Sequence, residues 1–98
     1  MKTDSRGNSY EQPAWELING AWYAFGTDGF AQSGLIFDHD LGGWFYIDIN
    51  SGMKTGWQLI DGSWYYFNPV SDGTRGKLYV SGQTSDGFRV DEKGRWIP

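Results

Sequence analysis

The strongest constraint on the fold is an internal repeat of about 20 residues. The segment WELINGAWYAF, residues 15–25, returns as WQLIDGSWYYF, residues 57–67. Between them, LIFDHDLGGWFYI, residues 35–47, has the same shape with two extra residues in its first turn. Each unit carries one recurrent tryptophan and one closing glycine: Trp22, Trp44 and Trp64, and Gly34, Gly56 and Gly76. This period is typical of a solenoid, in which each unit stacks on its neighbours.

Each unit is predicted to be a β-hairpin. Asn19-Gly20 and Asp61-Gly62 stand between short apolar runs, and these dipeptides adopt the positive φ angles of a two-residue type I′ turn. An isolated hairpin is only marginally stable in water, so the units must stack to bury their faces. We therefore predict an all-β fold, a solenoid of stacked β-hairpin repeats.

The repeat also sets the expected domain organisation. Residues 1–14 are polar and are predicted to be a linker. Residues 15–98 form the predicted repeat module. Its units cover residues 15–34, 35–56 and 57–78, followed by a weaker, degenerate unit over residues 79–98.

Composition limits the functions open to this chain. It has 98 residues, of which 18% are aromatic, with 15 glycines, no cysteine and one histidine. The formal net charge is −4, so no excess of basic residues can follow a phosphate backbone, and nucleic-acid binding is disfavoured. No apolar run is as long as a membrane span, and we expect no membrane insertion. The aromatic side chains, each burying roughly 150–250 Å², supply the apolar surface that a small domain needs.

The aromatic strands carry apolar side chains on both faces. Because side chains alternate along a strand, Trp64 shares a face with Tyr66, and Trp44 with Tyr46. The opposite face is predicted to pack inside the stack, and its residues are Tyr23, Phe25, Phe45, Ile47, Tyr65 and Phe67. A thin stack has one interior, so the tryptophan-bearing face should stay partly open in grooves, where exposed aromatic side chains indicate binding. Such walls can hold a quaternary ammonium by cation–π attraction or stack on sugar rings.

Two polar segments are the candidates for chemistry. In Asp38-His39-Asp40, three adjacent residues on an extended turn cannot all face one ion, so we interpret the segment as a solvated loop. The segment DINSG, residues 48–52, resembles the start of a calcium loop but lacks the distal glutamate, and we interpret it as a turn. The sequence shows no nucleophile constellation and no matched pair of carboxylates. The prediction is a non-catalytic chain, not an enzyme, with no metal site and no cofactor.

The repeated pattern W-x4-G-x-W-[YF]-x-[FI], closed by GMKTGW at residues 52–57, resembles the choline-binding and cell-wall-binding repeat family of Gram-positive bacteria and their phages. The tail DGFRVDEKGRW, residues 86–96, is similar to the degenerate last repeat of such arrays. The resemblance covers residues 15–96. It implies a left-handed superhelix of hairpins, usually appended to a hydrolase or another surface protein. It also implies that choline of teichoic acids sits between hairpins, held by two aromatic side chains of one unit, one of the next and often a methionine.

Carried over residue by residue, the family pattern predicts three ligand-binding grooves. The predicted binding residues form one set per groove: Trp15, Trp22 and Tyr46; Trp44, Met53 and Tyr66; and Trp57 and Trp64. Each groove departs from the pattern at one position, namely Ala31, Leu35 and Leu78 in turn. The third groove faces the degenerate tail, where residues 87–90 lack the tryptophan and tyrosine face and Arg89 would repel a cation if it pointed inward.

The resemblance implies a secreted, cell-wall-located module that anchors a larger protein to a choline-decorated or other cell-surface polymer. A catalytic or other domain is then expected on the N-terminal side. Two alternatives stay open. Related repeats occur in glucan-binding domains of sucrose-active enzymes, which indicates a glycan-binding module. Others occur in receptor-binding arrays of clostridial toxins, and the chain is then a structural spacer or protein-interaction array.

Overall fold

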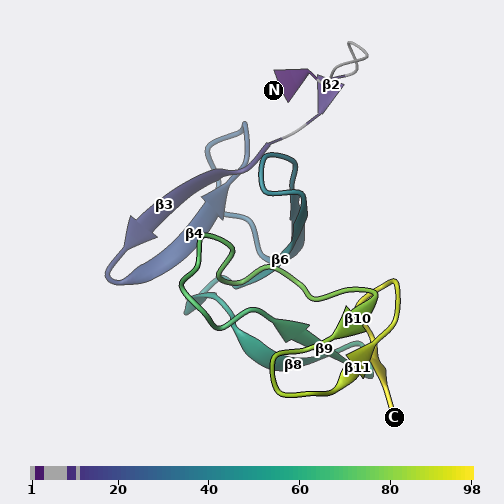
Figure 1. Ribbon diagram of the computed structural model, residues 1–98. Coiled ribbons are helices and arrows are strands. Elements are labelled where there is room, and N and C mark those ends of the chain that lie inside the picture. Colours follow the sequence, from purple (N-terminus) through teal and green to yellow (C-terminus); the bar gives the residue numbers. More distant parts are fainter. Residues whose placement is uncertain (1, 4–8, 11) are drawn as a thin grey trace. The chain divides into compact units, whose positions relative to one another are not determined.

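The computed structural model describes the backbone of residues 2–3, 9–10 and 12–98, with side chains from residue 12 onward. All the regular secondary structure among these described residues consists of β-strands, which confirms the predicted all-β class (Figure 1). No helix in the described ranges has the length and apolarity needed to cross a membrane. The chain divides into two compact units, Met1–Met53 and Lys54–Pro98, which are taken in turn.

The first unit is built from antiparallel strands that follow one another in the chain. The strand β1 (Lys2–Thr3) pairs with β2 (Ser9–Tyr10). A hairpin follows, made of β3 (Ala14–Ile18) and β4 (Ala21–Phe25). The third sheet contains β5 (Gly34–Asp38), β6 (Gly43–Asp48) and β7 (Gly52–Met53). The predicted linker covers residues 1–14, and residues 1, 4–8 and 11 of it are outside the described residues.

The second unit contains one regular hairpin and an irregular tail that packs on it. The hairpin consists of β8 (Gly56–Ile60) and β9 (Ser63–Phe67). The tail forms a small antiparallel sheet of β10 (Gly82–Gln83), β11 (Arg89–Val90) and β12 (Trp96–Ile97). Single bridges join Phe67 to Leu78 and Tyr65 to Arg95, so the tail is attached directly to β9.

The two-residue hairpin turns have the backbone conformation that their sequences predict. Asn19 and Gly20 have φ angles of 51° and 82°, and Asp61 and Gly62 have 50° and 83°. Positive φ at both central residues defines the type I′ turn, whose twist matches that of the flanking strands. The middle unit differs, since its turn runs over residues 39–42 and is closed by a 2.8 Å bond from the Gly42 N–H to the Asp38 carbonyl.

The two faces of the hairpins have different environments. Phe45, Ile47 and Phe67 are at most 1% exposed, as predicted for the packed face. The remaining members of that predicted set are only half-buried: Tyr23, Phe25 and Tyr65. On the other face, the recurrent tryptophans are 41–44% exposed, which confirms that this face stays partly open: Trp22, Trp44 and Trp64. The hairpins therefore bury one face unevenly and leave indole surface in contact with solvent.

One close backbone approach sets the internal geometry of the first unit. A Cβ placed on Gly52 would lie 2.8 Å from the Ala21 Cβ and 2.9 Å from the Trp22 carbonyl oxygen. Gly52 also has a φ of 85°, which residues other than glycine rarely adopt. The absence of a side chain at this position lets β7 lie directly against β4.

Candidate ligand-binding groove

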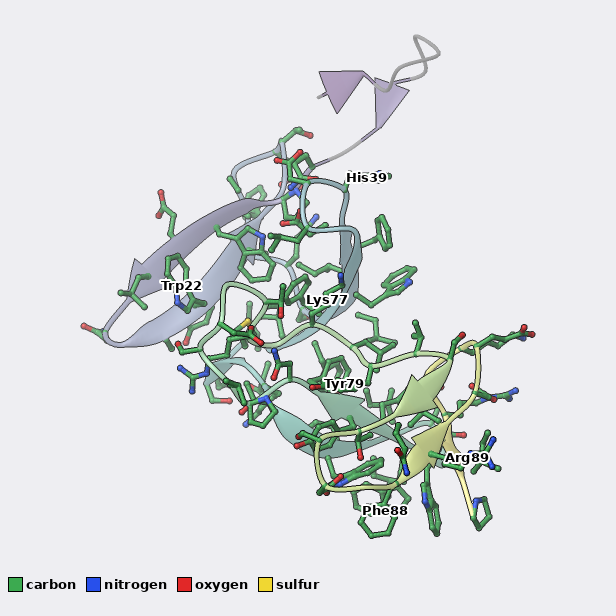
Figure 2. All side chains as sticks on the ribbon, viewed as in Figure 1. Trp22, His39, Lys77, Tyr79, Phe88 and Arg89 are labelled. Atoms are coloured by element: carbon green, nitrogen blue, oxygen red, sulfur yellow. The ribbon has the colours of Figure 1, made fainter. Side chains whose placement is uncertain are left out.

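The second unit has an open groove of about 410 Å³ whose walls are almost entirely aromatic. Its lining residues are Trp57, Trp64, Asp86, Phe88 and Trp96. The first two come from β8 and β9, where the register pairs Trp57 with Tyr66 and Leu59 with Trp64 and so places both indoles on one face. The other three come from the tail, and Figure 2 shows Phe88 on this C-terminal segment. The groove therefore joins a regular hairpin to the degenerate last repeat.

Tyr66 packs against Trp57, one of the side chains that line this groove. Its ring is 6% exposed and lies 4.9 Å from the Trp57 ring centroid and 5.3 Å from that of Tyr79. Its hydroxyl is 2.8 Å from the Ser85 Oγ, so the polar end of the buried ring has a partner. Phe88 meets Trp57 edge to face at 5.8 Å, an arrangement that aromatic pairs favour. The Trp57 indole is thus held between a buried ring and a tail ring.

Asp86 places a carboxylate at the groove. The Trp57 Nε1–H donates to its Oδ2 at 2.9 Å, and the Thr84 hydroxyl donates to its Oδ1. These bonds, that of Thr84 first, hold the pKa of Asp86 below its ordinary value of 3.8. At neutral pH the groove therefore carries a full negative charge beside its aromatic walls.

A tight turn over residues 84–88 positions both Asp86 and Phe88. The Thr84 N–H donates to the Phe88 carbonyl at 2.7 Å, and the Gly87 N–H donates to the Thr84 carbonyl at 3.1 Å. Gly87 has a φ of 92°, as expected for the glycine that ends a three-residue hairpin loop. The turn points the phenyl ring and the carboxylate toward the same groove.

Arg89 does not line the groove. It is exposed, and its register opposite Ile97 places it on the face of the tail sheet away from Trp96, which pairs with Val90. Residues 87–90 are predicted to lack the tryptophan and tyrosine face, but Phe88, with Trp96 further along the tail, lines the groove. The sequence signal for them is an Asp-Gly-aromatic turn followed by a tryptophan in a segment too irregular to match the repeat.

In the first unit, Trp15 makes the contact that corresponds to that of Trp57. Its Nε1–H donates to the Asp38 Oδ2 at 2.6 Å, and its ring meets Phe45 edge to face at 5.2 Å. Asp38 also accepts the Leu41 N–H at 2.9 Å. Burial raises the pKa of this carboxyl and is the largest single effect. Hydrogen bonds from Gln12, Leu41 and Trp15 together outweigh it and hold the pKa below 3.8.

The solvated-loop interpretation of Asp38-His39-Asp40 is wrong for its first residue. Asp38 is 2% exposed, because it ends β5 on the side that faces Trp15. His39 and Asp40 are exposed. The interpretation of residues 48–52 as a turn is confirmed, since the Asp48 carboxylate accepts the N–H groups of Asn50 and Ser51 at 2.8 and 3.2 Å. Among the described side chains, no three His, Cys, Asp or Glu residues gather as a metal site.

The members of the first predicted groove do not all lie on one face. Trp15 packs on Phe45, whereas Tyr46 points from the opposite face of the β5–β6 sheet. Trp22 lies 41% exposed on β4, in register with Leu17.

Trp44 and Met53, from the second predicted groove, belong to the first unit, and Tyr66 belongs to the second. Trp44 meets Phe37 edge to face at 5.3 Å, and Phe37 in turn meets His39 at 4.8 Å. Phe37 thus gives Trp44 an aromatic neighbour that the sequence analysis did not identify.

An all-β repeat module with an open aromatic groove is the class of protein that this geometry defines. The cell wall binding repeat of the choline-binding type matches residues 55–69. The choline-binding domain of Spr1274 from Streptococcus pneumoniae is 36% identical, with a TM-score of 0.71, over 86% of this chain and 93% of that chain. The chain belongs to the choline-binding, cell-wall-binding repeat family.

Two larger proteins contain a similar segment. Choline binding protein F of Streptococcus pneumoniae, solved in the presence of a peptidoglycan analogue, is 32% identical with a TM-score of 0.71, over 89% of this chain. Alternansucrase of Leuconostoc mesenteroides is 26% identical with a TM-score of 0.63, over 95% of this chain. This chain spans only 27% of the first protein and 8% of the second. A comparison with curated protein sequences gives no match.

Proposed function

We propose that this chain is a non-catalytic wall-anchoring module that binds a quaternary ammonium group, such as the choline of a cell-surface polymer, in the groove of the second unit. The observation that carries the proposal is the set of side chains lining that groove, three indoles, a phenyl ring and one ionised carboxylate. This composition suits an organic cation and offers little to an anion.

The physical basis is the attraction between a cation and the faces of aromatic rings. Each good contact is worth about 0.5–2 kcal/mol, and quaternary ammonium groups suit such sites because they carry charge with little hydrogen bonding. The Asp86 carboxylate adds attraction without closing the groove. The likeness to a choline-binding domain supports the choice of choline over other organic cations.

The family likeness also supports a proposal for the whole protein. The module attaches to the cell surface of a Gram-positive bacterium, after secretion, and carries a catalytic or other domain on its N-terminal side. The other predicted binding residues of the first unit are proposed as separate, secondary ligand contacts: Trp15, Trp22, Trp44, Tyr46 and Met53.

A fluorescence titration tests the cation site directly. Choline should change the tryptophan emission saturably, tetramethylammonium should do the same, and sodium chloride at equal ionic strength should not. Trp96→Ala removes a groove wall outside the regular hairpin and should weaken the choline response about tenfold. If choline does not change the tryptophan emission, or if sodium chloride changes it equally, the proposal is contradicted.

Glycan binding is the second candidate, supported by the similarity to alternansucrase, which has also been solved in complex with isomaltononaose. It predicts retention of the chain on a polysaccharide matrix, and loss of retention when Trp22 and Trp44 are changed to alanine. A spacer without any ligand predicts no response to either probe, and loss of folding rather than of binding in the same variants.

A further inference from the structure

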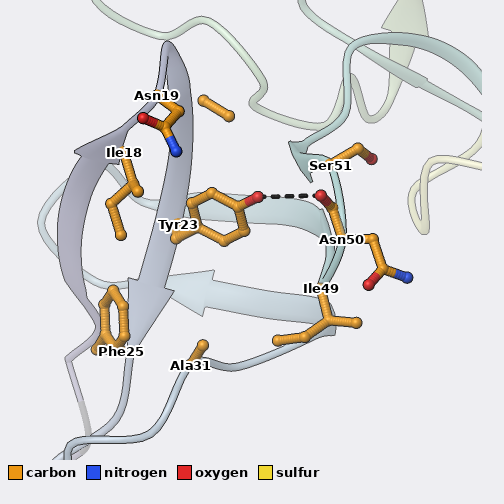
Figure 3. Close-up of a pocket in the computed structure, with 9 residues that line it drawn as sticks. Ile18, Asn19, Tyr23, Phe25, Ala31, Ile49, Asn50 and Ser51 are labelled. Atoms are coloured by element: carbon orange, nitrogen blue, oxygen red, sulfur yellow. Dashed lines mark hydrogen bonds between the residues drawn. The ribbon is translucent and has the colours of Figure 1, made fainter.

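Asn19 occupies an unusual place for an asparagine in this fold. It lies exposed at the tip of the β3–β4 hairpin, directly before Gly20 (Figure 3). Among the described residues, neither the Asn19 side-chain amide nor the Gly20 N–H takes part in a hydrogen bond. A Cβ placed on Gly20 would have no heavy atom within 4 Å. A side-chain amide carbon and an unbonded backbone nitrogen therefore stand next to each other in open space.

The other asparagines within residues 12–98 lack this combination. Asn50 is exposed, but the N–H that follows it, from Ser51, donates to the Asp48 carboxylate at 3.2 Å. Asn68 is 4% exposed and precedes Pro69, which has no N–H. Within this described range, only Asn19 thus has an unengaged backbone N–H beside its amide.

We infer that Asn19 is a site of deamidation in the folded protein. The Gly20 nitrogen attacks the Asn19 Cγ, the new N–C bond closes a succinimide ring, and the side-chain nitrogen leaves as ammonia with the proton of the Gly20 N–H. Water then opens the ring. Opening at Cγ gives aspartate, whereas opening at the main-chain carbonyl gives isoaspartate, in which the backbone runs through the side chain. Glycine favours ring closure because no Cβ obstructs the close approach of its nitrogen.

The surroundings of the hairpin tip leave room for both steps. Asn19 lines an open hollow of about 440 Å³, together with Tyr23 and the turn that follows β6, so water reaches the tip (Figure 3). Asn19 and Gly20 lie beyond the last register pair of the ladder, Ile18 with Ala21. Because turns open more readily than paired strands, the ring can close while the ladder stays intact.

The two products should affect the hairpin differently. Aspartate suits the turn, since Asp61 occupies the same position in the β8–β9 hairpin with a φ of 50°, against 51° for Asn19. Isoaspartate lengthens the main chain of a two-residue turn whose geometry sets the register of its strands. It should therefore loosen the β3–β4 hairpin and its 3.2 Å bond from the Tyr23 hydroxyl to the Asn50 carbonyl (Figure 3). The inference concerns the first unit and does not depend on the choline groove.

The test is incubation of the full chain at neutral pH, followed by peptide mass spectrometry and enzymatic labelling of isoaspartate. Residue 19 should change from amide to acid as a mixture of aspartate and isoaspartate. Asn50 should change at least about fivefold more slowly, because the Ser51 N–H first has to give up its hydrogen bond. Deamidation of Asn19 only in the urea-unfolded chain, or equal rates at Asn19 and Asn50, overturns the inference.

Exchanging the turn residues between the hairpins provides matched variants. Asp61→Asn places the same Asn-Gly pair at the tip of β8–β9, and residue 61 should then deamidate at a rate within about threefold of that of Asn19. Asn19→Asp should abolish ammonia release and keep the β3–β4 hairpin intact. In aged wild-type protein, the isoaspartate fraction should lose the native NMR shifts of the β3–β4 amides, whereas the β8–β9 amides keep theirs. An Asp61→Asn variant that does not deamidate at residue 61, or native β3–β4 shifts in the isoaspartate fraction, also overturns the inference.

Discussion

Each unit contains a hydrogen bond from a tryptophan to an aspartate, but the aspartate is buried in the first unit and exposed in the second. In the first unit, Trp15 donates to Asp38 at 2.6 Å, and the carboxylate is 2% exposed. In the second unit, Trp57 donates to Asp86 at 2.9 Å, and that carboxylate is exposed. Both tryptophans begin the same repeat motif. A hydrogen bond that helps to close the interior of one unit thus positions a charge at the open groove of the other.

The difference arises from the rings that surround each pair. Trp15 packs against Phe45, which is buried in a regular three-stranded sheet. Trp57 packs against Phe88, which is 48% exposed on the irregular tail. Both indoles are half-buried, but the second one also lines the open groove, together with Phe88 and Trp96 of the tail. The irregular last repeat therefore supplies side chains to the candidate groove, whereas Phe45 of the regular sheet lies buried beside Trp15.

Removing the two carboxylates should affect the free energy of unfolding very differently, and this is the largest expected difference. Asp38→Ala leaves the Trp15 and Leu41 N–H groups without their acceptor in a buried position, and should lower the free energy of unfolding by about 2–3 kcal/mol. Asp86→Ala should change stability little, because its carboxylate is exposed. Urea denaturation followed by circular dichroism measures both. Equal loss of stability in the two variants would remove the distinction.

Truncating the recurrent tryptophans should affect choline binding unequally. Trp64→Ala removes one wall of the groove and should raise the choline Kd about tenfold. Trp22→Ala is the matched variant, since Trp22 and Trp64 occupy the same repeat position and are similarly exposed. It should leave the tight-binding phase of the calorimetric titration within about twofold. A larger effect of Trp22→Ala would move the main site to the first unit.

Neutralising the groove carboxylate should produce a smaller, salt-dependent loss. Asp86→Asn keeps a hydrogen-bond acceptor for Trp57 but removes the charge, so choline affinity should fall about threefold at low salt and less at high salt. Asp38→Asn is the control and should not change affinity. Titrations at two sodium chloride concentrations separate this electrostatic effect from a loss of groove shape. A loss that does not depend on salt would assign Asp86 a purely structural role.

Protonation of Asp38 and Asp86 at low pH should have the smallest expected effect. It is confined to a narrow acidic pH range. The pKa values of Asp38 and Asp86 both lie below 3.8 in the folded chain. Each charge is therefore present above that value and is lost only as the pH falls through the lowered pKa. Choline affinity should stay constant across neutral pH and decrease only as the pH falls below 3.8.

Two variants assign this acid response to its groups. Thr84→Val removes the leading hydrogen bond to Asp86, raises the pKa of that carboxyl and should move the loss of choline affinity to higher pH. Asp38→Asn should instead flatten the acid dependence of stability, because it removes the group whose ionised form stabilises the first unit. A pH profile of choline affinity unchanged by Thr84→Val would show that Asp86 does not contribute to binding.

The hairpins and their turns could be predicted because the information is local. Asn19-Gly20 and Asp61-Gly62 need positive φ at two adjacent positions, and few other residue pairs allow it. The division of the strands into two faces follows from alternation alone, and it correctly placed Phe45, Ile47 and Phe67 inside. It failed for Tyr23 and Phe25, because alternation shows which side a residue faces but not whether anything covers that side.

The candidate groove depends on packing between segments that are distant in the chain. Residues 26–30 and 84–88 both end in Asp-Gly-Phe and form the same hydrogen-bonded turn, closed by bonds from Gly26 to Phe30 and from Thr84 to Phe88. Yet Phe30 is 73% exposed, whereas Phe88 packs on Trp57. Repeat period, turn type and strand faces thus follow from residues a few positions apart. Only the tertiary structure shows which turn covers which tryptophan, because that is decided by shape and burial across segments far apart in the chain.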